Sequence, residues 1–246
     1  MSAIPISFKD TNLRTAAVIP AAGRGVRLGP GTPKALRTLG GVPILVHAVR
    51  AMARTRTVQV IVVVAPPEDT AEVRALLDAH GLPESTDIRV VPGGLARQDS
   101  VRLGLAALPA DVDVVLVHDA ARPLVPVDTV EGVVEAVRAG APAVVPVLPL
   151  ADTVKSVDPD TGLVTGTPQR ALLRAVQTPQ GFDRGTLIRA HETVTDNVTD
   201  DASMVEQLGV PVLLVPGHEE AFKVTRPLDL VLAEAVLARR RATDGY

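Results

Sequence analysis

The chain has 246 residues, of which 46% are hydrophobic and 2% aromatic, and its formal net charge is −3. This composition is typical of a globular α/β core, and the scarcity of aromatic rings argues against binding of single-stranded nucleic acid by base stacking. The absence of cysteine excludes disulfide bonds and thiolate metal sites. We expect a cytoplasmic protein with no nucleic-acid partner and no membrane association, because the chain shows neither a signal-peptide pattern nor an apolar run long enough to cross a bilayer.

The first predicted element is a short buried strand, Ala16–Ile19, that opens into a glycine-rich loop. The loop contains four glycines and three cations, namely Gly23, Gly25, Gly29, Gly31, Arg24, Arg27 and Lys34. Backbone N–H groups in such a loop can face an anion, and nearby cations add charge, so the pattern suits a polyphosphate. It is neither a Walker A loop nor a complete dinucleotide fingerprint. An ordinary turn with solvated arginines therefore remains the alternative.

The charges are unevenly distributed along the chain. Residues 11–67 contain eight lysines and arginines but no aspartate or glutamate, and charge of one sign around a site attracts anionic ligands. Three of these cations, Arg50, Arg54 and Arg56, are more simply interpreted as the solvated end of a helix.

Strands and helices are predicted to alternate after the loop. We expect strands at 58–65, 88–91, 114–117, 143–147 and 211–215, and helices at 43–53, 68–80, 98–108, 128–139, 184–193, 201–208 and 228–241. The β-branched run at 58–65 is typical of a strand covered on both faces. The alternation predicts a doubly wound, mostly parallel Rossmann-like sheet. Since ligands bind at the carboxyl ends of such strands, the loops at 23–34, 93–100 and 118–122 should meet at one edge.

Residues 149–176 interrupt this regularity. Two short strands around the turn Asp158–Gly162 predict a β-hairpin, which is marginally stable by itself. We expect an arm that packs on a second copy of the chain, although a hairpin folded back on its own domain is an open alternative. Residues 1–246 would then form a single domain with a dimerisation arm inserted at 149–176.

Several motifs together resemble a known family. Residues 20–27 with Pro33 and Lys34 resemble the signature of sugar-nucleotide-type nucleotidyltransferases. The further stretches, at 93–101, 117–123, 177–180, 199–203 and 223–227, resemble the 2-C-methyl-D-erythritol 4-phosphate cytidylyltransferases. The resemblance spans about residues 15 to 238. It implies a nucleotidyltransferase domain that uses CTP and Mg²⁺, acts on a polyol phosphate, releases pyrophosphate, and forms a homodimer with exchanged hairpin arms.

The resemblance also implies roles for individual residues. The catalytic cations are Arg27 and Lys34. Nucleotide contacts are expected from Ala21, Ala22, Gly23, Gly94, Ser100, Asp119 and Ala120. The substrate phosphate would be held by Arg170 and Lys223, with Thr153 in the same pocket. Asp119 is also the expected metal ligand, and Glu220 is a weaker candidate.

Attack by an anionic phosphate on CTP needs no strong base, so His118 is expected to be structural. The sequence departs from the family pattern at Leu95, where some members have an acid, and at Ala221, where an asparagine is frequent. Two alternatives stay open: a cytidylyltransferase for another polyol phosphate such as ribitol 5-phosphate, and a nucleotide-binding regulator without turnover. Intact Arg27, Lys34 and Asp119 count against the regulator.

Overall fold

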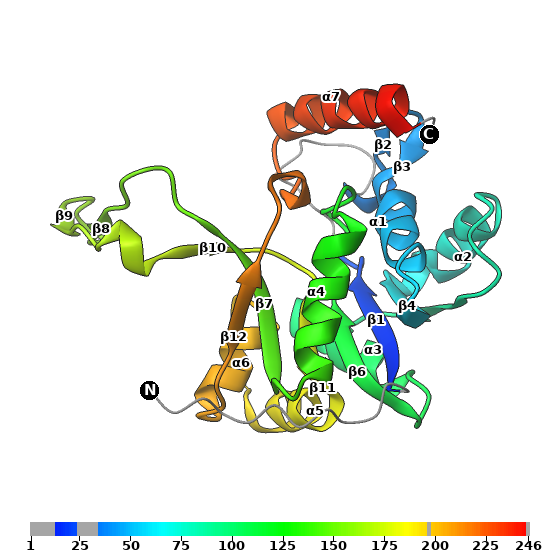
Figure 1. The fold of residues 1–246 in the computed structure, drawn as a ribbon, viewed down its shortest axis with the longest axis horizontal. Coiled ribbons are helices and arrows are strands. Elements are labelled where there is room, and N and C mark those ends of the chain that lie inside the picture. Colours follow the sequence, from blue (N-terminus) through cyan, green and yellow to red (C-terminus); the bar gives the residue numbers. More distant parts are fainter. Residues whose placement is uncertain (1–12, 24–33, 196–197, 245–246) are drawn as a thin grey trace.

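The computed structural model describes residues 13–23, 34–195 and 198–244. Its body is a mixed, mostly parallel sheet with the strand order β10-β7-β11-β6-β1-β4-β5, and β12 also pairs with β7 (Figure 1). The strands are β1 (Arg14–Pro20), β4 (Val58–Ala65), β5 (Asp87–Pro92), β6 (Val112–Val117), β7 (Ala143–Pro149), β10 (Arg174–Val176), β11 (Gln180–Asp183) and β12 (Leu213–Pro216). The predicted doubly wound, mostly parallel sheet is confirmed.

Helices cover both faces of this sheet. They are α1 (Ile44–Ala53), α2 (Thr70–Asp78), α3 (Arg97–Ala106), α4 (Val127–Arg138), α5 (Arg184–Thr193), α6 (Asp201–Gln207) and α7 (Pro227–Asp244). Side chains alternate along β1, so Ala17 and Ile19 pack with α1, α2 and α4, whereas Ala16 and Val18 pack with α3, α5 and α6. Helix α7 lies outside these layers, over the short strands β2 (Thr38–Leu39) and β3 (Val42–Pro43) (Figure 1). No helix in the described part of the chain combines the length and apolarity that crossing a bilayer requires.

Strand β11 is one of the elements that the sequence pattern did not predict; β2, β3 and β10 are others. It runs antiparallel between β6 and β7, with Gly181 opposite both Leu116 and Val144. A Cβ atom on Gly181 would lie 2.5 Å from Cγ1 of Val133 on α4. Glycine at this position therefore lets the helix pack directly against the inserted strand.

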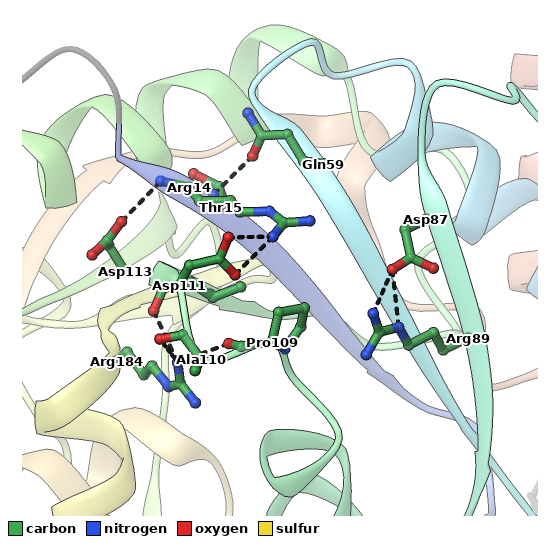
Figure 2. Close-up of polar contacts among 11 residues, drawn as sticks. Arg14, Thr15, Gln59, Asp87, Arg89, Pro109, Ala110, Asp111, Asp113 and Arg184 are labelled. Atoms are coloured by element: carbon green, nitrogen blue, oxygen red, sulfur yellow. Dashed lines mark hydrogen bonds and ion pairs between the residues drawn. The ribbon is translucent and has the colours of Figure 1, made fainter.

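Polar contacts hold the amino ends of the strands together (Figure 2). Arg14 on β1 pairs with Asp111 at 2.6 Å, and its backbone N–H donates to Asp113 at 3.0 Å. The next residue, Thr15, donates its N–H to the side-chain oxygen of Gln59 at 2.8 Å. These contacts satisfy charged and backbone groups where the strands begin, so this edge of the sheet has a structural role.

The predicted hairpin is present within residues 149–176. Its strands are β8 (Ser156–Val157) and β9 (Val164–Gly166), and the arm extends away from the sheet (Figure 1). The carboxylate of Asp158 accepts the N–H groups of Asp160 and Thr161, both at 2.9 Å, which fixes the turn. Leu163, Val164 and Leu172 are exposed on the arm.

Candidate active site

A cavity of about 300 Å³ opens at the carboxyl ends of β1, β5 and β6. It is lined by residues 20–23, Ala35, 94–97, Ser100, 119–121 and Lys223. The loops that follow these three strands thus meet at one edge of the sheet, as the topology predicts. All seven residues that the resemblance places around a nucleotide contribute to this lining.

Two adjacent glycines form the turn at one wall of the cavity, and the second of them, Gly94, lines it. A Cβ atom on Gly93 would lie 2.8 Å from Cβ of Ala22, and one on Gly94 would lie 2.4 Å from Cβ of Asp99. The N–H of Gly94 donates to the Ser100 hydroxyl at 3.2 Å, which ties the turn to the first part of α3. Only glycine fits this close approach, so at Gly94 the wall presents backbone rather than a side chain to the cavity.

Asp119 is the centre of a cluster of charges. Its Oδ2 lies 2.8 Å from Nζ of Lys223 and 3.6 Å from Nε of Arg122, and its Oδ1 lies 3.8 Å from Nε of Arg97. Burial opposes ionisation of Asp119, but the attraction of Lys223, Arg97 and Arg122 outweighs it and lowers the pKa of Asp119 to about 2. The carboxylate is therefore charged at neutral pH, and three cations surround it.

A second set of contacts, which sequence reasoning missed, holds Arg97. Its Nη1 lies 2.7 Å from Oδ2 of Asp201, and Oδ1 of Asp201 lies 3.0 Å from Nε2 of His191. The two acids at the start of α6 divide their roles, because Asp200 caps the helix by accepting the N–H of Ser203 whereas Asp201 is buried. Arg97 and Asp201 both lie in stretches of the sequence that resemble the family, at 93–101 and 199–203. This resemblance was the signal that could have pointed to them.

His118 has a structural environment, as expected. It is fully buried, its Nε2 lies 3.1 Å from the carbonyl oxygen of Arg122, and its Nδ1 lies 3.1 Å from Oγ1 of Thr178. Burial lowers its pKa to about 4, so the imidazole is neutral at pH 7. The same Thr178 oxygen accepts the N–H of Asp119 at 3.0 Å. His118 and Thr178 therefore hold the loop that presents Asp119.

The remaining predicted site residues are not among the described residues that line the cavity. Arg27 falls outside the described residues, and Lys34 opens the 3₁₀ turn Lys34–Leu36, whose Ala35 lines the cavity; only the backbone of Lys34 is described. Arg170 and Thr153 lie on the arm, where Nη1 of Arg170 donates to the carbonyl oxygen of Ala151 at 2.5 Å. A single chain does not bring these two arm residues to the cavity.

The donor set limits how a metal can bind. Among the described residues, no group of three or more His, Asp or Glu side chains is arranged to hold an ion. Glu220, the weaker candidate ligand, pairs with Arg239 and Arg240 and lines a different cavity. Asp119 is thus a single charged carboxylate in the described lining of the reaction cavity. That arrangement fits Mg²⁺ when phosphate oxygens of a nucleotide complete the coordination.

Comparison with known proteins gives the family. The family model described as IspD, 2-C-methyl-D-erythritol 4-phosphate cytidylyltransferase, matches residues 15–239. The chain belongs to this family. It is therefore a nucleotidyltransferase, and the resemblance carried by the sequence motifs is confirmed.

Individual members of the family are similar over nearly the whole chain. The 2-C-methyl-D-erythritol 4-phosphate cytidylyltransferase of Streptomyces avermitilis is 76% identical over 238 residues, which cover 95% of each chain. The Streptomyces coelicolor enzyme of the same name is 74% identical over 95% of this chain and 88% of its own. Among solved structures, the enzyme of that name from Thermus thermophilus is 36% identical, with a TM-score of 0.72 over 92% of this chain and 100% of that one.

Proposed function

We propose that this protein joins CTP and 2-C-methyl-D-erythritol 4-phosphate to give 4-diphosphocytidyl-2-C-methyl-D-erythritol and pyrophosphate, in the non-mevalonate isoprenoid pathway. The observation that carries the proposal is the cavity at the carboxyl ends of β1, β5 and β6, which gathers the family's motif residues in one place. Membership of the cytidylyltransferase family, with relatives of 76% and 74% identity, supports the choice of substrates.

The proposed reaction is an in-line displacement. A phosphate oxygen of the polyol phosphate attacks the α-phosphorus of CTP, a new P–O bond forms, and the bond from the α-phosphorus to the bridging oxygen of the leaving pyrophosphate breaks. A phosphate monoester is already anionic near neutral pH, so no strong base is required. The buried and neutral His118 is consistent with such a mechanism.

Charge neutralisation is the main catalytic requirement. We assign to Arg27 and Lys34 the stabilisation of charge that develops on the triphosphate, where a positioned donor contributes about 3–4 kcal/mol. Mg²⁺, held by Asp119 and phosphate oxygens, would supply further neutralisation when bound. The Gly93–Gly94 turn presents backbone groups that can select cytosine and exclude a larger purine.

Lys223 is proposed to bind the phosphate of the polyol substrate. Its side chain is 40% exposed and lines the cavity, so Nζ can move from Asp119 to an incoming phosphate. Asp119 would keep Arg97 and Arg122 as neighbours, at 3.8 and 3.6 Å. The charge of the carboxylate thus stays compensated while Lys223 is engaged.

We further propose that the chain is one domain whose arm at 149–176 reaches the cavity of a second copy. Arg170 and Thr153 would then complete the polyol phosphate pocket of the partner. The exposed apolar residues of the arm, including Leu163 and Val164, support this role, because exposed apolar surface favours an interface.

The function is tested by measuring pyrophosphate release with CTP, ATP, GTP and UTP against a panel of polyol phosphates. We expect kcat/KM to be highest for CTP with 2-C-methyl-D-erythritol 4-phosphate. A preference for ribitol 5-phosphate would support the first alternative instead. Binding of CTP without any turnover would support a regulator.

Mixing of two inactive variants tests the shared pocket. Arg170→Ala removes the arginine that the arm would supply, and Lys223→Met removes the lysine of the cavity itself. A homodimer of either variant therefore has two defective pockets and should lose activity. In a random mixture, half of the dimers contain one chain of each variant. In such a dimer, the pocket that keeps Lys223 receives an arm that keeps Arg170, so one of the two pockets is intact. About a quarter of the wild-type activity should therefore return. A mixture no more active than the mean of its components would contradict exchange of the arms.

A further inference from the structure

A second and larger cavity lies apart from the reaction cavity. It has a volume of about 890 Å³ and is formed by α1, residues 123–127, the segment at 218–220 and the carboxyl-terminal half of α7. Its lining shares no residue with that of the reaction cavity. The two cavities are therefore separate sites on the same body.

Arginines dominate the lining of this second cavity. Five contribute to it, namely Arg50, Arg54, Arg239, Arg240 and Arg241, together with His47 and His218. Glu220 is the only acid among the described lining residues. Counting the arginines and Glu220 alone, the lining carries four more positive charges than negative ones. Arg50 and Arg54, which the sequence suggested lie at the solvated end of a helix, line this cavity together with residues of α7, and Arg54 is exposed.

The contacts of four of these arginines supply little negative charge. The single carboxylate of Glu220 pairs with both Arg239 and Arg240. Arg50 and Arg241 donate to backbone carbonyl oxygens, those of His80 at 2.7 Å and Gly40 at 3.4 Å. A carbonyl group satisfies a guanidinium donor but carries no net charge to balance it.

Two titratable groups of the cavity, Arg54 and His47, have pKa values lowered by burial and by neighbouring arginines. Burial, followed by the proximity of Arg50 and Arg240, lowers the pKa of Arg54. Burial is also the main reason that the pKa of His47 is lowered; Arg50 and Arg241 add to the effect, whereas the Leu39 carbonyl and Glu234 oppose it. An anion inside the cavity would relieve this repulsion between like charges.

We propose that this cavity is a second anion-binding site, which takes a small molecule carrying two or more phosphate groups. Its volume lies within the range of small-molecule sites, and guanidinium groups bind phosphate through paired hydrogen bonds. Val42, Leu124 and Leu237 supply apolar walls for the carbon skeleton of such a ligand. The concave shape favours a small molecule over a nucleic-acid strand, which would need an extended groove with aromatic platforms.

One segment connects the second cavity with the reaction cavity. Glu220 lies in the 3₁₀ turn Glu219–Ala221, whose last carbonyl oxygen accepts Nη1 of Arg122 at 2.7 Å. Arg122 in turn lies 3.6 Å from Asp119 in the reaction cavity. A ligand that competes with Glu220 for its arginine partners therefore acts on a segment in contact with the reaction cavity.

Calorimetric titration of the full chain tests the site. Fructose 1,6-bisphosphate serves as the probe, and saturating CTP is present so that the nucleotide pocket is occupied. We expect one equivalent of probe to bind, and the double variant Arg54→Gln/Arg241→Gln to bind it at least about 10-fold more weakly, because two charge-assisted contacts are lost. Lys223→Met, in the reaction cavity, should bind the probe as the wild type does.

A matched control and a second variant make the test decisive. Arg189→Gln removes one arginine from α5, at the opposite end of the molecule from α7, and should leave affinity unchanged (Figure 1). Arg239→Gln, whose side chain is 66% exposed, replaces the double variant if that variant unfolds, and should also weaken binding. Absence of saturable binding, equal affinity in the cavity variants, or loss of binding in Lys223→Met would overturn the proposal. None of these readouts depends on turnover.

Discussion

Replacement of Lys223 by methionine tests whether the ammonium group of this residue binds the polyol phosphate. Methionine keeps most of the length of the side chain but removes the ammonium group that lies 2.8 Å from Asp119. If Lys223 binds the polyol phosphate, the variant loses one charge-assisted hydrogen bond to that substrate. Such a bond contributes about 1.5–3 kcal/mol, so kcat/KM for the polyol phosphate should fall roughly 10- to 100-fold.

The fold should tolerate the same substitution. The Lys223 side chain is 40% exposed, and ion pairs of this kind contribute about 0–1 kcal/mol to stability. Asp119 also retains two other cations, with Arg122 at 3.6 Å and Arg97 at 3.8 Å. The free energy of unfolding in urea should therefore change little while catalytic efficiency drops.

The assay is pyrophosphate release with one substrate varied and the other saturating. We expect KM for the polyol phosphate to rise while KM for CTP stays within about twofold, and Lys223→Arg to recover part of the loss because it restores the charge. A rise in KM for CTP alone, or wild-type kinetics for both substrates, would refute the assignment of Lys223 to the polyol phosphate.

Two further predictions concern stability. The pKa of Asp119 is lowered from 3.8 to about 2 in the folded chain, so its contribution of about 2 kcal/mol should be present above pH 4 and lost as the pH falls towards 2. Urea unfolding of the wild type and Asp119→Asn from pH 7 to pH 3 checks this, and a difference independent of pH would contradict it. Gly104→Ala should destabilise the protein by about 1–3 kcal/mol, because its Cβ atom would lie 2.5 Å from Cγ1 of Val18. Gly132→Ala on α4, where a Cβ atom meets nothing within 4 Å, is the matched control and should be neutral or stabilising in thermal unfolding.

The sequence predicted those features that depend on local pattern. The run Val58–Ala65 forms a strand with seven of eight residues buried, because β-branched side chains favour a strand covered on both faces. The meeting of loops from distant parts of the chain followed from the rule that parallel strands place their carboxyl ends at one edge.

Features that depend on tertiary packing were not predicted. Strand β11 has four residues including Gly181, which is too short to show a periodicity, and its partners β6 and β7 are distant in the sequence. The pairing of Asp201 with Arg97 joins residues 104 positions apart. The sequence does not indicate which of the two acids at the start of α6, Asp200 or Asp201, caps the helix and which one is buried.

The pairing of β7 with β10 has a consequence for how the arm can change over time. Arg174 lies opposite Pro149 in this antiparallel pair, so the chain enters and leaves the arm at adjacent positions. Insertions, deletions or wholesale replacement between these two residues need not disturb the register of the sheet. The arm can therefore change in length, or be grafted from one homologue to another, without a change in the catalytic body, as long as Thr153, Arg170 and the apolar residues of the interface are kept.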